Sequence, residues 1–157
     1  PEYSLTRTEI ALLSTHADAI AAAVGPGVMV EFGIGNARKV SPLLKTGQVT
    51  TFVALDISTT ALQNALKGLA DEHPAIAMLG ICCDHTQLRQ LPQHPALEGQ
   101  PRIGFFPGSS LGNFTPKEAV QFLANARQLL AGGPLLLGLD QPRDPALMEA
   151  AYDDAAG

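Results

Sequence analysis

Apolar and polar positions along the chain follow a pattern that predicts strands and helices in alternation. Short apolar runs over residues 28–32, 51–55, 76–81, 102–106 and 135–139 are typical of buried strands. Apolar residues at helical spacing predict a helix before residue 28, one over 59–71 and one over about 115–130. Shorter helices are expected over 38–45 and 144–151, and at most one helical turn near 86–91 in the polar, proline-rich segment 84–101.

Strands that alternate with helices favour a parallel sheet with right-handed crossovers. We therefore expect an α/β fold of three layers, αβα, with a mainly parallel sheet of about five strands. Residues 1–27 are expected to form an N-terminal arm and helix, and residues 28–157 a core domain. Ligands of such sheets bind outside the carboxyl ends of the strands.

The first predicted strand ends in Glu31 and is followed by Gly33 and Gly35 before the next helix begins. Strand, glycine turn and helix in this order are typical of a nucleotide-type cofactor site, because glycine lets the backbone approach a ligand closely. A plain tight turn is the alternative. Arg38 occupies the position of the third glycine of the dinucleotide fingerprint, which disfavours a nicotinamide-dependent oxidoreductase.

Acidic residues also follow the other predicted strands. Asp56 lies 23 residues after Gly33, close to the spacing at which a carboxylate meets the hydroxyl pair of a ribose. Asp84, Asp140 and the loop over residues 107–114 fall at further strand ends. This convergence on one edge of the sheet predicts a binding site without reference to any relative.

Composition restricts the partners. The net charge of −5, with no basic cluster, makes nucleic acid an unsuitable partner. The longest apolar stretch, near residues 134–139, is too short to cross a membrane, and no signal-peptide pattern is present, so we expect a cytoplasmic protein.

Adjacent Cys82 and Cys83 are expected to be buried, reduced thiols, with a vicinal disulfide as the alternative. The histidine and cysteine spacing predicts no metal site.

Several stretches resemble a known family. The segment Glu31–Gly35 resembles the first motif of class I S-adenosylmethionine-dependent methyltransferases, which have a Rossmann-like fold. More specifically, the chain is similar to the histidine Nα-methyltransferases of ergothioneine biosynthesis, and the most specific match is the Phe-Phe-Pro-Gly-Ser-Ser-Leu-Gly-Asn-Phe stretch over 105–114. Further matches cover residues 1–9, 31–39, 56–58, 137–140 and 151–154. The family continues beyond this last stretch, so we expect a methyltransferase core truncated at its C-terminus, without the family's substrate-binding subdomain and final strands.

The resemblance implies S-adenosyl-L-methionine as cofactor and a small amino acid, histidine or a related amine, as substrate. The cofactor-binding residues it implies are Tyr3, Glu31, Gly33, Gly35, Lys39, Asp56, Asp84 and His85. Glu31 would lie near the cofactor's amino group, Lys39 would pair with its carboxylate, Asp56 would accept from the ribose, and Asp84 and His85 would border the adenine. The alternative for Lys39 is an exposed helix lysine.

Asn113 and Tyr152 are the residues expected to bind the substrate, with no residue assigned as a catalytic base. An ordinary loop asparagine and a core tyrosine at a helix end are the alternatives. Two other functions stay open: methylation of another amine, such as an indole amino acid derivative, and a cofactor-binding domain that is inactive alone because its substrate portion is absent. The sequence predicts no oligomeric state.

Overall fold

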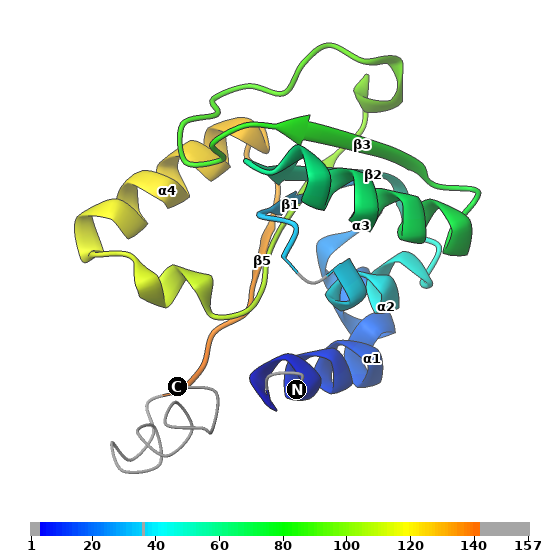
Figure 1. The fold of residues 1–157 in the computed structure, drawn as a ribbon, viewed down its shortest axis with the longest axis horizontal. Helices are drawn as coiled ribbons and strands as arrows, with labels where there is room; N and C mark the ends of the chain where they lie inside the picture. The colour runs from blue at the N-terminus through cyan, green and yellow to red at the C-terminus, as the bar shows by residue number, and fades with distance from the viewer. Residues whose placement is uncertain (1–3, 36, 142–157) are drawn as a thin grey trace.

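Five strands and four α-helices make up the part of the chain that the computed structural model describes, residues 4–35 and 37–141 (Figure 1). The strands are β1 (Gly27–Phe32), β2 (Val49–Asp56), β3 (Ala77–Cys82), β4 (Arg102–Phe106) and β5 (Leu135–Leu137). The α-helices are α1 (Ser4–Val24), α2 (Ser41–Leu44), α3 (Thr59–Glu72) and α4 (Pro116–Leu129). Three 3₁₀ turns, η1 (Ala37–Lys39), η2 (Pro95–Leu97) and η3 (Ser110–Asn113), complete the set.

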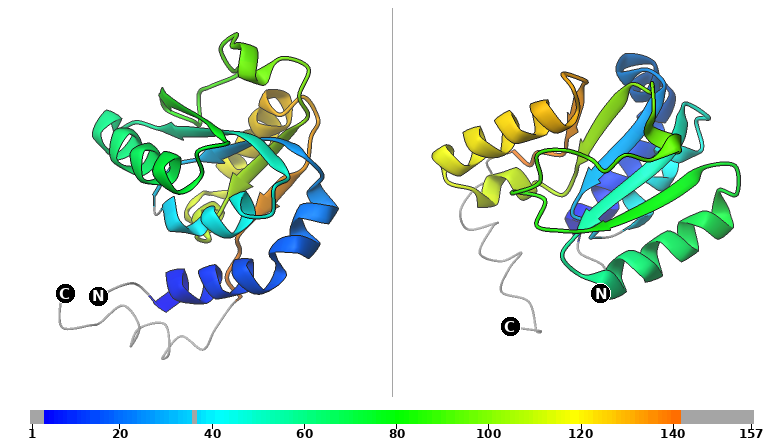
Figure 2. Two further views of the ribbon diagram at one scale, coloured as in Figure 1. Left: turned by 90° about the vertical axis from the view of Figure 1, so that its right-hand side faces the viewer. Right: turned by 90° about the horizontal axis from the view of Figure 1, so that it is seen from above.

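All neighbouring strands pair in parallel, in the order β3-β2-β1-β4-β5. Helices α1, α2 and α3 lie against one face of this sheet and α4 against the other, as two perpendicular views show (Figure 2). This is the three-layer αβα architecture predicted from the sequence, and the predicted fold class is confirmed. Among the described residues, no helix combines the length and the apolar character needed to span a membrane.

Two apolar cores, one on each face, follow from the alternation of side chains along β1. Met29 packs with Phe52 and Phe105 on the face of α1 to α3, whereas Val30 and Phe32 pack with residues of α4. Because successive side chains point to opposite faces, Glu31 has the same orientation as Met29 and lies beneath α1 and α2. The strand register therefore decides which side of the sheet receives the buried carboxylate.

Helix α4 begins with the capping box that its sequence predicts. Thr115 Oγ1 accepts from the Glu118 N–H, and Glu118 Oε2 accepts from the Thr115 N–H at 2.8 Å. These bonds satisfy two of the amides that the first turn of a helix leaves without partners. The Thr115 hydroxyl also donates to Glu118 Oε2 at 2.7 Å, and this bond, followed by the one from the Thr115 N–H, lowers the pKa of Glu118.

The helix predicted over residues 38–45 is instead two short elements, η1 and α2. Pro42 has no N–H to donate to the carbonyl of Arg38, so one continuous helix cannot pass through it. The prediction of at most one helical turn near 86–91 is compatible with the structure, in which the Gln87 and Leu88 N–H groups donate to Asp84 O in a single turn. The short helical element of this segment lies later, in η2.

Two further predictions need correction. Strand β5 ends at Leu137 rather than at residue 139. At the next residue, the Gly138 N–H donates to Phe106 O, and the Gly138 carbonyl accepts from the Ser109 N–H. Cys82 is exposed and not buried; Cys83 is partly buried, and both thiols are free. The helix predicted over 144–151 lies outside the described residues.

Candidate functional site

The carboxyl ends of the parallel strands form one rim, and four of the predicted site residues meet there. Gly33 follows β1, Asp56 ends β2, and Asp84 and His85 follow β3. Together with Ile57 they line a surface hollow of about 310 Å³. An open hollow at the strand ends of an α/β sheet is the expected place for a nucleotide-type ligand.

The turn after β1 is built so that its backbone stays open to a ligand. Gly33 and Gly35 have φ angles of +82° and +38°, a conformation that residues with a side chain rarely adopt. The Ile34 N–H donates to Asp56 Oδ2 at 3.1 Å, and the Ser58 N–H donates to Asp56 Oδ1 at 2.8 Å. The Asp56 carboxylate thus joins the ends of β1 and β2, and each of its oxygens retains further acceptor capacity.

Asp84 and His85 border the hollow in different ways. Asp84 Oδ1 accepts from the hydroxyl and the N–H of Thr86, and these bonds lower the pKa of its exposed carboxyl group. The His85 ring packs edge-on against Phe32, Phe106 and Phe122. Burial among these rings lowers the His85 pKa, so the imidazole is neutral near pH 7.

A cluster of buried charges lies beside the glycine turn, on the α1 face of the sheet. Glu31 is 1% exposed, and its Oε2 atom has no hydrogen-bond partner among the described residues. Desolvation raises its pKa well above the ordinary value; the Lys39 charge opposes this rise, and Glu9 and Asp56 add to it. Lys39 is 8% exposed, so the alternative of an exposed helix lysine is wrong.

The Lys39 ammonium forms an ion pair with Glu9 of α1, with 2.8 Å between Nζ and Glu9 Oε2. Charge holds this pair without an aligned hydrogen bond, since Glu9 Oε2 has no hydrogen-bond partner in the described part of the chain. Glu9 Oε1 accepts from the Gly108 N–H at 2.8 Å. Helix α1 is therefore fastened both to the segment after β1 and to the loop after β4.

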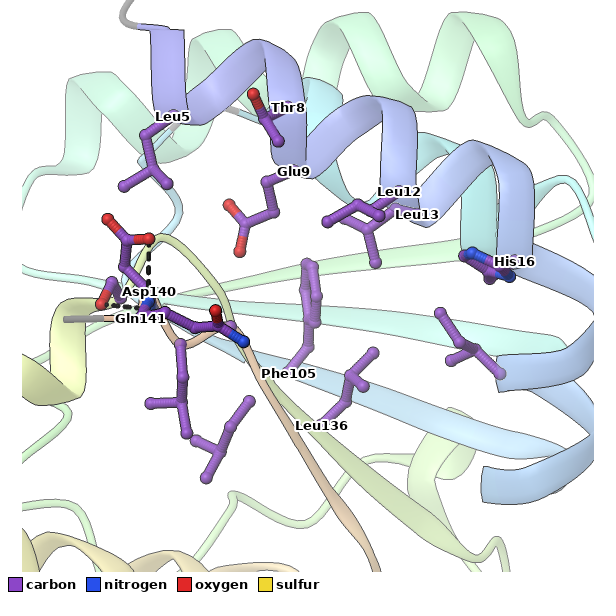
Figure 3. Close-up of a pocket in the computed structure, with 15 residues that line it drawn as sticks. Leu5, Thr8, Glu9, Leu12, Leu13, His16, Phe105, Leu136, Asp140 and Gln141 are labelled. Atoms are coloured by element: carbon purple, nitrogen blue, oxygen red, sulfur yellow. Dashed lines mark hydrogen bonds between the residues drawn. The ribbon is translucent and has the colours of Figure 1, made fainter. Parts of the chain in front are cut away.

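A second, larger cavity of about 470 Å³ lies between α1 and the strands β4 and β5 (Figure 3). Its walls are largely apolar, with Leu12 and Leu13 of α1 opposite Phe105 and Leu136. The side chain of Glu9 points from α1 into this space. The cavity therefore adjoins the charged cluster, whereas the predicted adenosine-binding residues line the smaller hollow.

Of the three remaining predicted site residues, Asn113, Tyr3 and Tyr152, only Asn113 lies within the described part of the chain. Asn113 ends η3 on the same rim, is exposed, and lines neither of these two cavities. Tyr3 and Tyr152 lie outside the described residues. The roles given to these three residues, and to the cofactor-binding residues described above, stay predictions.

Two residues of the site were given no role from the sequence. Ile57 is 76% exposed at the edge of the hollow, an unusual position for a large apolar side chain directly after a strand. Glu9 lies four residues before the buried Leu13 on α1, and therefore on the same helix face. An acidic residue on the buried stripe of that helix is the signal that would have found it.

Comparison with known proteins identifies relatives over the whole chain. Residues 1–157 match the family described as histidine-specific methyltransferases, S-adenosylmethionine-dependent. The chain is 36% identical over 163 residues to a histidine N-alpha-methyltransferase of Mycolicibacterium smegmatis, covering 100% of this chain and 49% of that protein. It is 32% identical over 164 residues to ergothioneine biosynthesis protein 1 of Neurospora crassa, covering 99% of this chain and 18% of that protein.

Solved structures support the fold. The glycopeptide N-methyltransferase MtfA, solved with S-adenosyl-L-methionine, has a TM-score of 0.55 at 21% identity, covering 79% of this chain and 48% of its own. The chain spans about half the length of the mycobacterial relative. The family match over residues 1–157 and the methyltransferase fold agree with the resemblance found in the sequence: the chain belongs to the family of histidine-specific, S-adenosylmethionine-dependent methyltransferases.

Proposed function

We propose that the protein transfers a methyl group from S-adenosylmethionine to the α-amine of a small amino acid, histidine or a close relative. One observation carries the proposal: the hollow at the carboxyl rim brings Gly33, Asp56, Asp84 and His85 together, as a cofactor site at the strand ends requires. The division into an N-terminal arm (1–27) and a cofactor-binding core (28–157) belongs to the same proposal. The free Cys82 and Cys83 suit a reducing compartment, and we assign the activity to the cytoplasm.

The adenosine part of the cofactor fits the residues of the hollow. Asp56 Oδ1 and Oδ2 each accept one backbone N–H and have lone pairs left for the two ribose hydroxyls. The exposed Ile57 side chain offers an apolar surface for the adenine ring. Both bonds from Thr86 go to Asp84 Oδ1, so we assign Oδ2 to the exocyclic amine of adenine.

The amino-acid part of the cofactor fits the charged cluster. Glu31 offers a buried oxygen, Oε2, to which no described residue donates, and an ammonium group would satisfy it. Lys39 carries the buried positive charge that suits a carboxylate. The open backbone at Gly33 and Gly35 admits the chain that links these two groups to the adenosine. We assign Tyr3 to cover the cofactor, and Asn113 and Tyr152 to the substrate.

The bound cofactor supplies a methyl group on a positively charged sulfur. The substrate amine must reach that carbon in line and in its neutral form, and the positive charge of the adjacent sulfur disfavours the ammonium form. A strong general base is therefore not required. The task of the protein is to align the two reactants and to exclude water.

The test is mass spectrometry of histidine incubated with the protein and S-adenosylmethionine. We expect methylated histidine, and no methylated product from tryptophan in a parallel incubation. Calorimetry with cofactor and then with histidine distinguishes the failures. Cofactor binding without histidine binding would favour another amine, or a binding domain that is inactive alone, and no cofactor binding would refute the proposal.

A further inference from the structure

Glu9 connects three separate parts of the molecule through one carboxylate. Its helix, α1, precedes the sheet; Lys39 belongs to η1, after β1; and Gly108 lies in the loop after β4. Oε2 lies 2.8 Å from Lys39 Nζ, and Oε1 accepts from Gly108 N at 2.8 Å. The Lys39 and Glu9 side chains are only 11% and 14% exposed, so solvent screens this pair weakly.

Two glycines leave the space that this carboxylate and its partner occupy. A Cβ atom on Gly138 would overlap Glu9 Oε1, and a Cβ atom on Gly108 would lie 2.9 Å from Lys39 Nζ. Close approach of the backbone is thus needed on both sides of the ion pair. The ion pair is therefore enclosed by backbone on two sides and differs from a contact between two exposed surface side chains.

The cluster contains two carboxylates and one ammonium, and the ammonium is paired with only one of them. Lys39 pairs with Glu9, whereas buried Glu31 Oε2 has no hydrogen-bond donor among the described residues. The groups that act electrostatically on Glu31 are Lys39, Glu9 and Asp56, and Lys39 is the cation among them. Lys39 exerts the largest charge effect on the Glu31 carboxyl group, so Glu31 is the carboxylate that the Lys39 ammonium would approach without Glu9.

We propose that Glu9 is a positioning residue that holds the Lys39 ammonium away from Glu31 and so keeps the Glu31 carboxylate open to the ammonium group of the cofactor. The inference rests on the proposed function, because it assumes that Glu31 receives that group. When Glu9 loses its charge, Lys39 turns to Glu31 and occupies the acceptor that the ligand needs.

The test uses two adenosyl thioethers, of which only one carries an ammonium group. The decarboxylated analogue of S-adenosylhomocysteine carries the amine without the carboxylate, and 5′-methylthioadenosine carries neither. In calorimetry, Glu9→Gln should weaken the analogue about tenfold relative to 5′-methylthioadenosine, the loss expected for one charge-assisted contact. Asp18→Asn, which removes an exposed carboxylate from the same helix, should leave the ratio unchanged.

A second substitution separates positioning from simple loss of negative charge. Lys39→Met alone should change the affinity for the analogue less than threefold, because Lys39 is held by Glu9 in the unaltered protein; in the Glu9→Gln background it should restore about tenfold. Equal effects of Lys39→Met in the two backgrounds would overturn the proposal. The double variant also avoids an unpaired buried ammonium, so it folds even where Glu9→Gln alone does not.

The outcomes keep the two proposals distinct. An unaltered protein that binds neither ligand contradicts the proposed function itself. A protein that binds both ligands with the same affinity, or a Glu9→Gln variant that keeps the unaltered ratio, contradicts the role of Glu9 alone.

Discussion

Replacing Asp56 by alanine should remove most of the affinity for the adenosyl group. The Asp56 carboxylate is positioned by the N–H groups of Ile34 and Ser58, at 3.1 and 2.8 Å. Two ribose hydroxyls bound to a charged acceptor contribute at least about 1.5 kcal/mol each, or about 3 kcal/mol in total. A loss of that size weakens binding on the order of 100-fold, and Asp56→Asn, which keeps one acceptor oxygen, should fall between the two.

The assay is calorimetric titration with S-adenosylhomocysteine and with its 2′-deoxy analogue. Removing the 2′-hydroxyl should weaken binding to the unaltered protein and have little effect on Asp56→Ala, because the hydroxyl then has no partner to lose. Asp71→Ala, which removes an exposed carboxylate from α3, is the matched control and should bind like the unaltered protein. Equal affinity of Asp56→Ala and the unaltered protein for S-adenosylhomocysteine would refute the reasoning.

Three further predictions concern stability. Burial raises the Glu31 pKa above its ordinary value of 4.5, so between the unfolded and the folded pKa the folded state binds more protons than the unfolded chain, and stability falls as pH rises through that range. Glu31→Gln should therefore raise Tm relative to the unaltered protein near pH 7 to 8 and not at pH 4; a pH-independent difference would contradict this. Gly138→Ala places a methyl group against Glu9 Oε1 and 2.9 Å from the backbone N of Gly108, which cannot move aside as a side chain can, and should cost about 1–3 kcal/mol in urea unfolding. Gly68→Ala, in open space on α3, should not destabilise, and equal costs for the two would refute the packing argument. Thr115→Ala removes one half of the capping box and should lower the unfolding free energy by about 1 kcal/mol, and an unchanged urea midpoint would contradict the role of the cap.

The sheet was predictable because its strands read as continuous apolar runs, which are buried in the central strands β1, β2 and β4. The edge strands β3 and β5, also predicted as buried, are partly exposed. All five strands occur where such runs lie, and the order of elements alone placed Gly33, Asp56 and Asp84 on one rim. The start of α4 was equally predictable, because Thr115 and Glu118 form their contacts within one turn of helix. These features depend on neighbours in sequence or on the parallel topology.

The features that were missed depend on contacts between distant segments. The burial of Lys39 requires Glu9, which lies 30 residues away on another element, and Gly138, which leaves room for the Glu9 carboxylate. His85 was expected only to border the adenine, yet its ring is packed among Phe32, Phe106 and Phe122 from three other elements. No spacing within one segment encodes such contacts.

A crystal structure of the protein with S-adenosylhomocysteine tests the central claim most directly. We expect the ribose hydroxyls within hydrogen-bonding distance of the Asp56 carboxylate, the adenine against Ile57, and the amino group at Glu31. A ligand bound instead in the apolar cavity between α1 and β5, with the hollow around Gly33 and Asp56 empty, would contradict the account.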